Sequence, residues 1–254
     1  MAIGLAEIVA NKRAELASRK ASAVAILAEP VARADGSFLR ALQSGGLKLI
    51  TEIKPASPSG GILTDNLDLG SVLASYNRHA SAISVLTDSQ YFQGSLGLLS
   101  EVASQSWQPL LCKDFILDPL QVYEARRAGA HAVLLIVKIL DDSTLAGLHD
   151  TIIALGMTPV VEVQDEGELS RALAVNPQIL LINNRDLSTF EISLETTRRL
   201  APLVPPAVTL VSASGIQTRA DIEELLPLCS RFLIGSVLMQ SGDLEQKLKE
   251  LKGI

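Results

Sequence analysis

Several acidic and basic side chains in this chain lie inside or directly after apolar, β-branched segments, where ionisable groups are unusual. Glu52 and Lys54 are two residues apart in LITEIK, so a strand would place both on the same face. Lys113 follows Leu-Leu-Cys, and Glu162 stands among valines in VVEV. Buried Lys and Glu are almost always paired, and such pairing tunes them for acid–base chemistry. The alternative is that they form salt bridges that only cap strand ends.

The last two apolar segments end in small residues that suit an anionic ligand. Ser214 and Gly215 follow TLVSA, and Gly235 and Ser236 follow RFLI. Residues this small let backbone N–H groups approach a phosphate closely. One such pair would be weak support, but two pairs at neighbouring segments indicate a phosphate site.

Other candidate ligand contacts follow the remaining apolar segments. Asn183 can orient a hydroxyl or a carboxylate, and Arg185 can hold a carboxylate through two hydrogen bonds. Ser57 begins a Gly- and Ser-containing loop whose hydroxyls can contact the same ligand. Phe92 and Phe115 stand on loops, where they can form a pocket for a flat apolar ring. A surface turn at 183–186 and ordinary packing of the two aromatics are the alternatives.

Eight apolar segments carry these groups and predict strands, nearly all with polar residues at the carboxyl end. They are 48–53, 82–86, 109–113, 132–137, 158–163, 179–183, 208–212 and 231–235. Amphipathic segments such as 119–128 and 169–174 lie between them and predict helices. In an α/β fold of the (β/α)8 TIM-barrel type, such strand ends converge on one active site. We therefore expect one barrel domain over residues 1–254; an open doubly wound sheet is the rival.

Residues 1–46 precede the first strand and are expected to form an N-terminal helical extension. Apolar residues recur at helical spacing over 4–30, and a second short helix is predicted over 37–43, before Gly45-Gly46. Periodicity alone leaves two placements open for these helices. They can form a lid over the barrel mouth or a plug at its bottom.

The composition narrows the class of protein and its partners. Net charge is −6, which argues against a nucleic-acid partner. No apolar stretch is long enough to span a bilayer, and the first residues lack the features of a signal peptide, so we expect a cytoplasmic protein without a membrane partner. Cys112 and Cys229 stand in or beside apolar segments and read as reduced core thiols, and no spacing typical of a metal site is present.

Six segments together resemble indole-3-glycerol phosphate synthase, an enzyme of tryptophan biosynthesis: EIKPASPSGG, SVLTDSQYFQGS, LCKDFI, VEV, INNRDL and IGS. The resemblance runs from about Leu47 to the last strand, and LAEIVANKRAEL is similar to the leading helix of the family. It implies a carbon–carbon lyase (a carboxy-lyase, or decarboxylase) without metal or cofactor. The substrate would be the sugar phosphate 1-(2-carboxyphenylamino)-1-deoxyribulose 5-phosphate, and other enzymes of the pathway would be partners.

The resemblance also implies roles for individual residues. Lys113 would be the general acid, Lys54 would meet the substrate carboxylate, and Glu162 would be the general base. The remaining positions would hold the lysines and hydroxyls (Glu52, Asn183), contact substrate (Ser57, Arg185), bind phosphate (Gly215, Gly235, Ser236) or line the anthranilate pocket (Phe92, Phe115).

Two departures from the family pattern bear on the active site. The family ordinarily reads Ser-Glu-Ser-Gly where this chain has Ala213 in place of the glutamate, and Leu181 replaces a usual glycine. They motivate an alternative, a paralogue with an altered substrate or strongly reduced activity. Two further alternatives are a Schiff-base aldolase using Lys113 or Lys54 and a non-catalytic sugar-phosphate-binding protein. Retention of both lysines and Glu162 argues against the latter.

Overall fold

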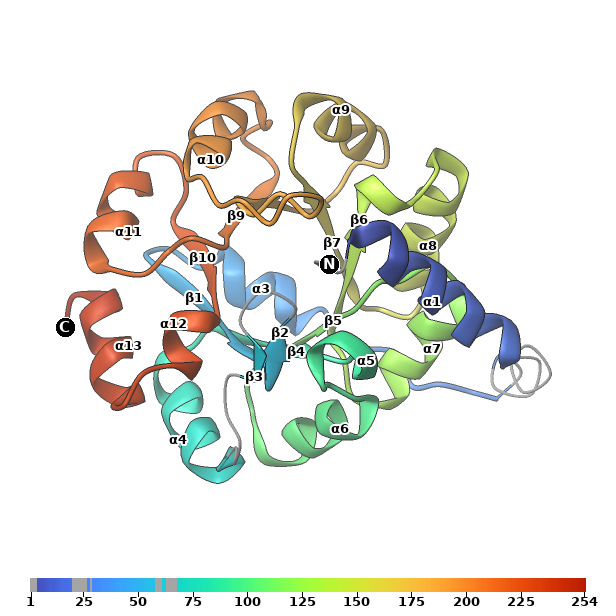
Figure 1. The fold of residues 1–254 in the computed structure, drawn as a ribbon, viewed down its shortest axis with the longest axis horizontal. Coiled ribbons are helices and arrows are strands. Elements are labelled where there is room, and N and C mark those ends of the chain that lie inside the picture. Colours follow the sequence, from blue (N-terminus) through green and yellow to red (C-terminus); the bar gives the residue numbers. More distant parts are fainter. Residues whose placement is uncertain (1–3, 20–26, 28, 58–60, 63–67) are drawn as a thin grey trace.

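The computed structural model describes the chain apart from residues 1–3, 20–26, 28, 58–60 and 63–67. Eight parallel strands close into a barrel in the order β1-β10-β9-β8-β7-β6-β5-β4, which confirms the (β/α)8 fold and rules out the open sheet (Figure 1). The strands are β1 (Lys48–Ile53), β4 (Ala82–Leu86), β5 (Leu110–Lys113), β6 (Ala132–Ile136), β7 (Thr158–Val163), β8 (Ile179–Asn183), β9 (Thr209–Ala213) and β10 (Arg231–Ile234).

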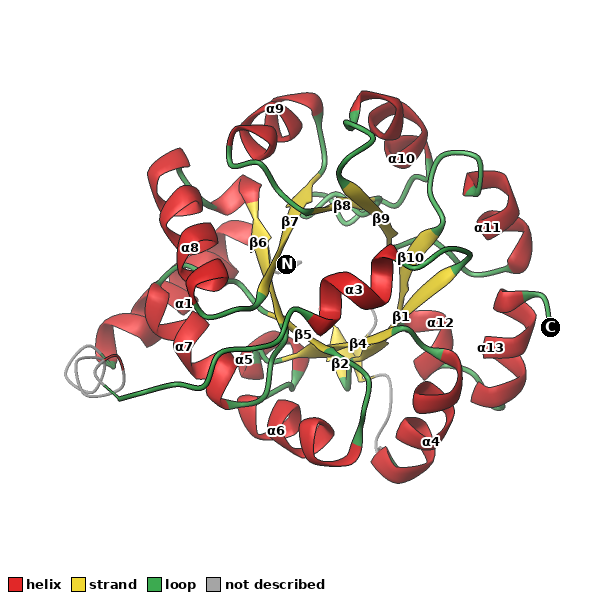
Figure 2. Cartoon of the chain, turned by 180° about the vertical axis from the view of Figure 1, so that it is seen from behind, coloured by secondary structure: helices red, strands yellow, loops and turns green. Residues whose placement is uncertain are grey.

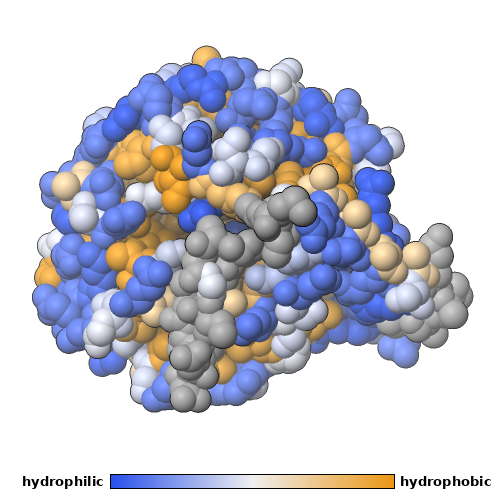
Figure 3. Space-filling view, viewed as in Figure 1, coloured by the Kyte–Doolittle hydropathy of each residue, from blue (hydrophilic) through white to orange (hydrophobic). Residues whose placement is uncertain are grey.

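Helices surround the barrel and separate successive strands (Figure 1). They are α4 (Leu69–His79), α5 (Ser89–Phe92), α6 (Leu96–Gln105), α7 (Pro119–Arg127), α8 (Asp142–Ala154), α9 (Glu166–Ala174), α10 (Glu195–Leu200), α11 (Arg219–Leu225), α12 (Ser236–Met239) and α13 (Leu244–Lys252), with single 3₁₀ turns at Val137–Ile139 and Ala201–Leu203. Asp118 and Thr218 begin α7 and α11 with reciprocal capping boxes, which satisfy backbone amides that a helix start leaves unpaired. The outer helices present mainly hydrophilic residues, and hydrophobic ones gather near the middle of the face in Figure 3.

The inner face of the barrel is aliphatic below and polar at its upper end. Ile50, two residues before Glu52 on β1, belongs to the buried interior cluster with Leu111 and Val160. Side chains two residues apart on β1 point to the same face. The inner face therefore changes along the chain from the aliphatic Ile50 to Glu52 and, directly after the strand, to Lys54. The barrel interior is thus a packed aliphatic core, and its ionisable side chains lie in the layer at the carboxyl ends of the strands.

Two helices of the N-terminal extension lie wholly within the described residues, and they cover opposite ends of the barrel. At the strand starts lies α3 (Ser37–Gln43), which buries Phe38 and Leu42 completely against the interior cluster; Arg231 Nε donates to the Leu42 carbonyl at 2.6 Å (Figure 2). At the carboxyl ends lies α1 (Leu5–Ser18), whose Ile8 is buried in the same cluster as Phe115. One helix is therefore the plug and the other lies over the rim.

The prediction of one continuous helix over 4–30 was wrong. The first helix ends at Ser18, whose hydroxyl donates to the Glu15 carbonyl, and Arg19 leaves the helical conformation. Ser side chains compete in this way for backbone groups and weaken a helix from within. Glu29 and Pro30 are also outside any helix, as expected because proline disfavours helical conformation in the residue before it. Residues 20–26 and 28 lie outside the described part.

The segment after β1 contains a short antiparallel pair, β2 (Ala56–Ser57) with β3 (Gly61–Ile62). The predicted flexible loop at 57–61 therefore has paired ends, and residues 58–60 lie outside the described part. Cys112 and Cys229 are free and buried, as expected. Among the described residues, no helix combines the length and apolar character needed to cross a bilayer.

Candidate active site

Glu52 holds both lysines at the carboxyl end of the barrel. Its Oε1 lies 2.9 Å from Lys54 Nζ and its Oε2 lies 3.5 Å from Lys113 Nζ. Glu52 is only 3% exposed, whereas both lysines are partly open to a shared cavity of about 250 Å³. Since β1 and β5 both neighbour β4 in the closed sheet, the fold itself brings these two strand ends together. We call Glu52, Lys54 and Lys113 the catalytic cluster, after the role that is proposed for them below.

Burial and pairing together shift the pKa values of Glu52 and Lys113. Burial disfavours the Glu52 carboxylate, but Lys54 and Lys113 outweigh it and lower the pKa of Glu52 to about 2. Burial likewise disfavours the Lys113 ammonium, but Glu52 and Glu162 raise its pKa above the ordinary lysine value. Lys113 is therefore a charged ammonium at neutral pH, which is the form that can donate a proton.

Glu162 has the opposite tendency. Burial raises the pKa of its carboxyl above the ordinary value, and the attraction of Lys113 and a hydrogen bond from Asn183 only partly offset this. Asn183 Nδ2 donates to Glu162 Oε1 at 3.0 Å, and Asn183 Oδ1 accepts from the Arg185 amide at 3.0 Å. These two bonds fix which way the Asn183 amide points. A carboxylate whose pKa is raised in this way is a stronger proton acceptor than an ordinary glutamate.

The predicted anion-binding residues line the same cavity. They are Ser214, Gly215, Gly235 and Ser236. Lys54 Nζ donates to Ser236 Oγ at 3.0 Å, which ties this end to the catalytic cluster. Gly235 is needed for close approach, because a Cβ there would lie 2.4 Å from Glu52 Oε1.

The two aromatic candidates differ in position. Phe92, at the end of α5, lines the cavity. Phe115 packs against it, with ring centroids 6.2 Å apart and planes tilted by 40°, and is itself 7% exposed. Phe115 therefore supports Phe92, and its direct contact with a ligand stays a prediction. Ser57 lies in β2, and its side chain is outside the described part of the chain.

The loop after β8 supplies cavity residues that sequence reasoning missed. Arg185 was expected there, but Leu187, Phe190 and Ile192 also line the cavity. Arg185 and Ile192 form an antiparallel bridge, which folds the loop back over the mouth. Burial lowers the pKa of Arg185, and the nearby Glu52 carboxylate acts in the opposite direction. The sequence offered one indication of this, the apolar Leu187 and Ile192 in a loop. Apolar side chains in a loop indicate that the loop packs over another part of the protein or over a ligand.

Comparison with known protein families shows the family to which this chain belongs. The family model described as indole-3-glycerol phosphate synthase matches residues 5–251. The chain belongs to the indole-3-glycerol phosphate synthase family.

Relatives in this family are of two lengths. An indole-3-glycerol phosphate synthase of Dehalococcoides mccartyi is 47% identical over 215 residues, which cover 83% of each chain. One from Lachnospira eligens is 41% identical over 87% of this chain and 85% of its own. A tryptophan biosynthesis protein TrpCF of Vibrio parahaemolyticus is 41% identical over 99% of this chain but only 53% of its own length. The chain thus spans about half the length of the TrpCF relatives.

Solved structures with the same fold extend beyond the indole-3-glycerol phosphate synthase family. A 3-hexulose-6-phosphate synthase of Salmonella typhimurium superposes with a TM-score of 0.64 over 82% of this chain and 97% of that chain. The sequence identity is 12%, so this likeness shows the fold alone.

The two departures from the family pattern both lie inside the barrel. Ala213 lines the cavity at its inner end and is 3% exposed, and Leu181 is fully buried beside Glu162 in the strand register. A larger side chain at 181 and a smaller one at 213 thus occupy adjoining strands of the interior cluster. The names of the relatives give no support to a paralogue with altered activity.

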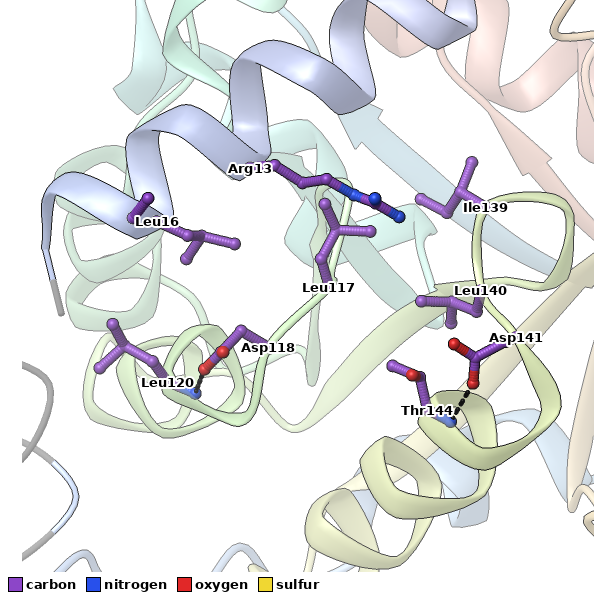
Figure 4. Close-up of a pocket in the computed structure, with 10 residues that line it drawn as sticks. Arg13, Leu16, Leu117, Asp118, Leu120, Ile139, Leu140, Asp141 and Thr144 are labelled. Carbon is purple, nitrogen blue, oxygen red and sulfur yellow. Dashed lines mark hydrogen bonds between the residues drawn. The ribbon is translucent and has the colours of Figure 1, made fainter.

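A second pocket lies outside the barrel mouth, beneath α1 (Figure 4). Arg13 and Leu16 extend from α1 toward the starts of α7 and α8. The acidic groups there are already used, because Asp118 accepts from the Leu120 amide and Asp141 from the Thr144 amide, each at 2.8 Å. This pocket follows from the packing of α1 and contains no acid–base pair.

Proposed function

We propose that this protein closes the indole ring of 1-(2-carboxyphenylamino)-1-deoxyribulose 5-phosphate, with loss of CO₂ and water. The observation that carries the proposal is the contact of one buried carboxylate, Glu52, with two lysines at the cavity. Family membership supports the same reaction. The substrate has a phosphate, an aromatic carboxylate and a carbonyl, and the cavity offers small residues, an aromatic wall and ammonium groups.

In the proposed mechanism, Lys113 donates its proton to the ribulose carbonyl oxygen while the carboxyl-bearing ring carbon attacks the carbonyl carbon. Lys54 meets the substrate carboxylate until the ring carbon–carboxylate bond breaks, and the electrons of that bond restore the aromatic ring. The new hydroxyl then takes a proton from Lys54 and leaves as water. Glu162 accepts the proton whose loss from the closed ring completes the pyrrole ring, and it can return that proton to Lys54. The raised pKa of Lys113 and that of Glu162 support this division of roles.

The binding roles follow the lining of the cavity. Glu52 keeps both lysines in place, Asn183 orients Glu162 and a substrate hydroxyl, and Arg185 contacts the substrate. Ser214, Gly215, Gly235 and Ser236 take the phosphate, Phe92 faces the anthranilate ring with Phe115 behind it, and Ser57 contacts the ligand from the loop after β1. No metal or cofactor has a role in this scheme.

A direct assay tests the proposal. The purified chain is incubated with the carboxyphenylamino-deoxyribulose phosphate, and the formation of the indole product is followed by its fluorescence. Product formation that depends on the protein and is lost on heating is the expected result. Absence of product at millimolar substrate would overturn the proposal and favour the paralogue or binding-only readings.

Location and partners extend the same proposal. We infer a cytoplasmic enzyme that works beside other enzymes of tryptophan synthesis, because the TrpCF relatives are named for that pathway. Net charge of −6 supports the absence of a nucleic-acid partner, and no membrane partner is proposed. Cell fractionation and co-purification of pathway enzymes test these two statements.

A further inference from the structure

Behind the proposed phosphate end lies a buried set of hydrogen-bonded polar side chains: Asn184, Thr197 and Ser212. They are 1%, 0% and 0% exposed. Asn184 Nδ2 donates to Ser212 Oγ at 3.0 Å, and Asn184 Oδ1 accepts from the Thr197 amide at 3.0 Å and its hydroxyl at 2.8 Å. The hydroxyls of Thr197 and Ser212 are 2.7 Å apart. Polar groups buried this deeply, with every partner inside the protein, define one conformation of the backbone that they touch.

The backbone that they touch is the turn after β9. Asn184 Nδ2 donates a second hydrogen bond to the Ser214 carbonyl at 3.0 Å, and the Asn184 amide donates to the Ala213 carbonyl at 2.8 Å. Ser214 and Gly215 have φ values of +68° and +81° in succession. A positive φ is unfavourable for serine and persists only where the surroundings impose it.

The loop after β8 supports the same turn from outside. The Ser193 amide donates to the Asn184 carbonyl at 2.9 Å, so Asn184 joins the two loops. A Cβ at Gly215 would lie 2.7 Å from Ile192 Cγ2 and 3.2 Å from Leu194 Cδ2, which shows how closely this loop covers the turn. The turn therefore cannot change conformation without moving Asn184 or the loop after β8.

We infer that Asn184, Thr197 and Ser212 are positioning residues that set the affinity for the substrate phosphate by holding the Ser214–Gly215 turn. They act through the turn and do not line the cavity themselves. The inference rests on the proposed function in one respect, the placement of the phosphate at this turn. It predicts that damage to the set weakens phosphate binding more than it slows the chemical steps at Lys113.

A matched pair of variants at Thr197 tests the inference. Thr197→Val keeps the shape of the side chain but removes its hydroxyl, and Thr197→Ser keeps the hydroxyl but removes the methyl group. Calorimetric titration with inorganic phosphate measures the affinity, and steady-state kinetics separate KM from kcat. We expect Thr197→Val to weaken phosphate binding about tenfold, which corresponds to about 1.4 kcal/mol. Thr197→Ser should stay within about twofold of wild type.

Three outcomes bear on the inference. A raised KM with kcat within about threefold of wild type, in Thr197→Val only, supports it. Equal losses of phosphate affinity in both variants, or a loss in neither, overturn it, because a merely structural role does not depend on the hydroxyl. If Thr197→Val lacks the wild-type circular dichroism spectrum, Ser212→Ala replaces it, with the same expected loss.

Failure of the proposed function is visible separately. If the wild-type chain forms no indole product, the proposed reaction is wrong, but the phosphate titrations of the Thr197 pair still report on the turn. Binding of the indole product without its phosphate is the internal control. Its affinity should be unchanged in Thr197→Val, and a tenfold loss there would show that the damage is not confined to the phosphate end.

Discussion

Two buried clusters of lysine and carboxylate lie at the same end of the barrel, with inverted composition. In the catalytic cluster, Glu52 pairs with Lys54 and Lys113. In the second, which we call the anchor cluster, one lysine pairs with two aspartates: Lys12 Nζ of α1 lies 2.9 Å from Asp88 and 3.1 Å from Asp114. Burial alone therefore does not distinguish an ion pair proposed to be catalytic from one that is structural.

The two clusters differ in what pairs with their excess charge, which is negative in the anchor cluster and positive in the catalytic cluster. In the anchor cluster, Asp88 also accepts from the Tyr91 amide at 2.8 Å, and Asp114 accepts from the Phe115 amide at 2.7 Å and the Thr87 hydroxyl at 2.8 Å. Lys12 is 5% exposed. In the catalytic cluster, the surplus ammonium groups face a cavity. A substrate carboxylate or carbonyl can accept hydrogen bonds from these ammonium groups. Around Asp88 and Asp114, by contrast, groups of the protein itself already supply the hydrogen-bond partners.

The anchor cluster nevertheless has a task that serves the site. Asp114 follows Lys113 directly, and Asp88 caps α5, which ends at Phe92. The contacts of Lys12 thus attach α1 to the ends of two strands, one next to Lys113, the proposed general acid, and one next to Phe92, which lines the cavity. This arrangement predicts that the same substitution at the two lysines has different consequences.

The largest expected effect is that of Lys113→Met. Removal of the proposed general acid should lower kcat by roughly 10²–10⁴-fold, because positioned proton transfer contributes about that much. The urea unfolding midpoint should change little, since Glu52 keeps Lys54 at 2.9 Å. Indole fluorescence at saturating substrate measures the rate. A variant that keeps more than a tenth of the wild-type rate would remove Lys113 from this role.

The matched substitution Lys12→Met should act on stability. It leaves Asp88 and Asp114 buried without their cation, and breaking a buried pair from one side costs about 3–5 kcal/mol. We expect the free energy of unfolding in urea to fall by that amount and kcat to stay within about tenfold of wild type. Adding Asp114→Asn should recover part of the loss. A fall in kcat as large as that of Lys113→Met, with unchanged stability, would place Lys12 in the catalytic machinery.

The sequence predicts these two clusters unequally. Glu52 and Lys113 of the catalytic cluster stand out because they lie within or at the end of an apolar strand, where charged residues are rarely buried unless they are paired. The neighbouring Glu162 stands out for the same reason. Lys12 lies in ANKRAEL, where it looks like any exposed helical lysine, and only the docking of α1 brings it to Asp88 and Asp114.

For the fold and the phosphate end, too, features set by local sequence were predictable and features set by tertiary contacts were not. All eight strands were predictable within one or two residues at each end from their β-branched composition. The end of α1 at Ser18 was not, because helix ends depend on local competition for hydrogen bonds. Nor was the set around Asn184, since Thr197 in ETTRR looks like an ordinary helical threonine until tertiary contacts bury it.

A smaller effect is expected from Asn183→Ala, read as a change in pH dependence. The hydrogen bond from Asn183 favours the ionised form of Glu162, so its loss raises the pKa of Glu162 further above the ordinary glutamate value. Because only the carboxylate can accept a proton, the acidic limb of kcat should move to higher pH, by about one unit or less. Lys12→Met should leave this limb in place, and Glu162→Gln should lose it. An unmoved limb in Asn183→Ala would mean that Glu162 is not the titrating base.

The smallest expected effect is that of Ala213→Glu. This substitution adds a second carboxylate near the two lysines of the catalytic cluster and so makes its net charge less positive. A new carboxylate at the inner end of the cavity can keep a nearby ammonium charged and accept a hydrogen bond from a substrate hydroxyl. One preorganised group of this kind is worth about 3–4 kcal/mol. Much of that gain is offset, because Ala213 is 3% exposed in an aliphatic layer and burial raises the free energy of the charged form.

We therefore expect kcat to rise only roughly threefold in Ala213→Glu, with a lower unfolding midpoint, since the gain and the burial cost nearly cancel. Ala213→Gln, which has nearly the same shape without the charge, is the control and should show the lower midpoint without the gain in rate. Steady-state rates at saturating substrate separate the two variants. Equal or lower turnover in Ala213→Glu would mean that the site is built around alanine and that the surplus positive charge is itself what the substrate requires. That result would leave the contrast between the clusters intact but would favour a paralogue with a different substrate.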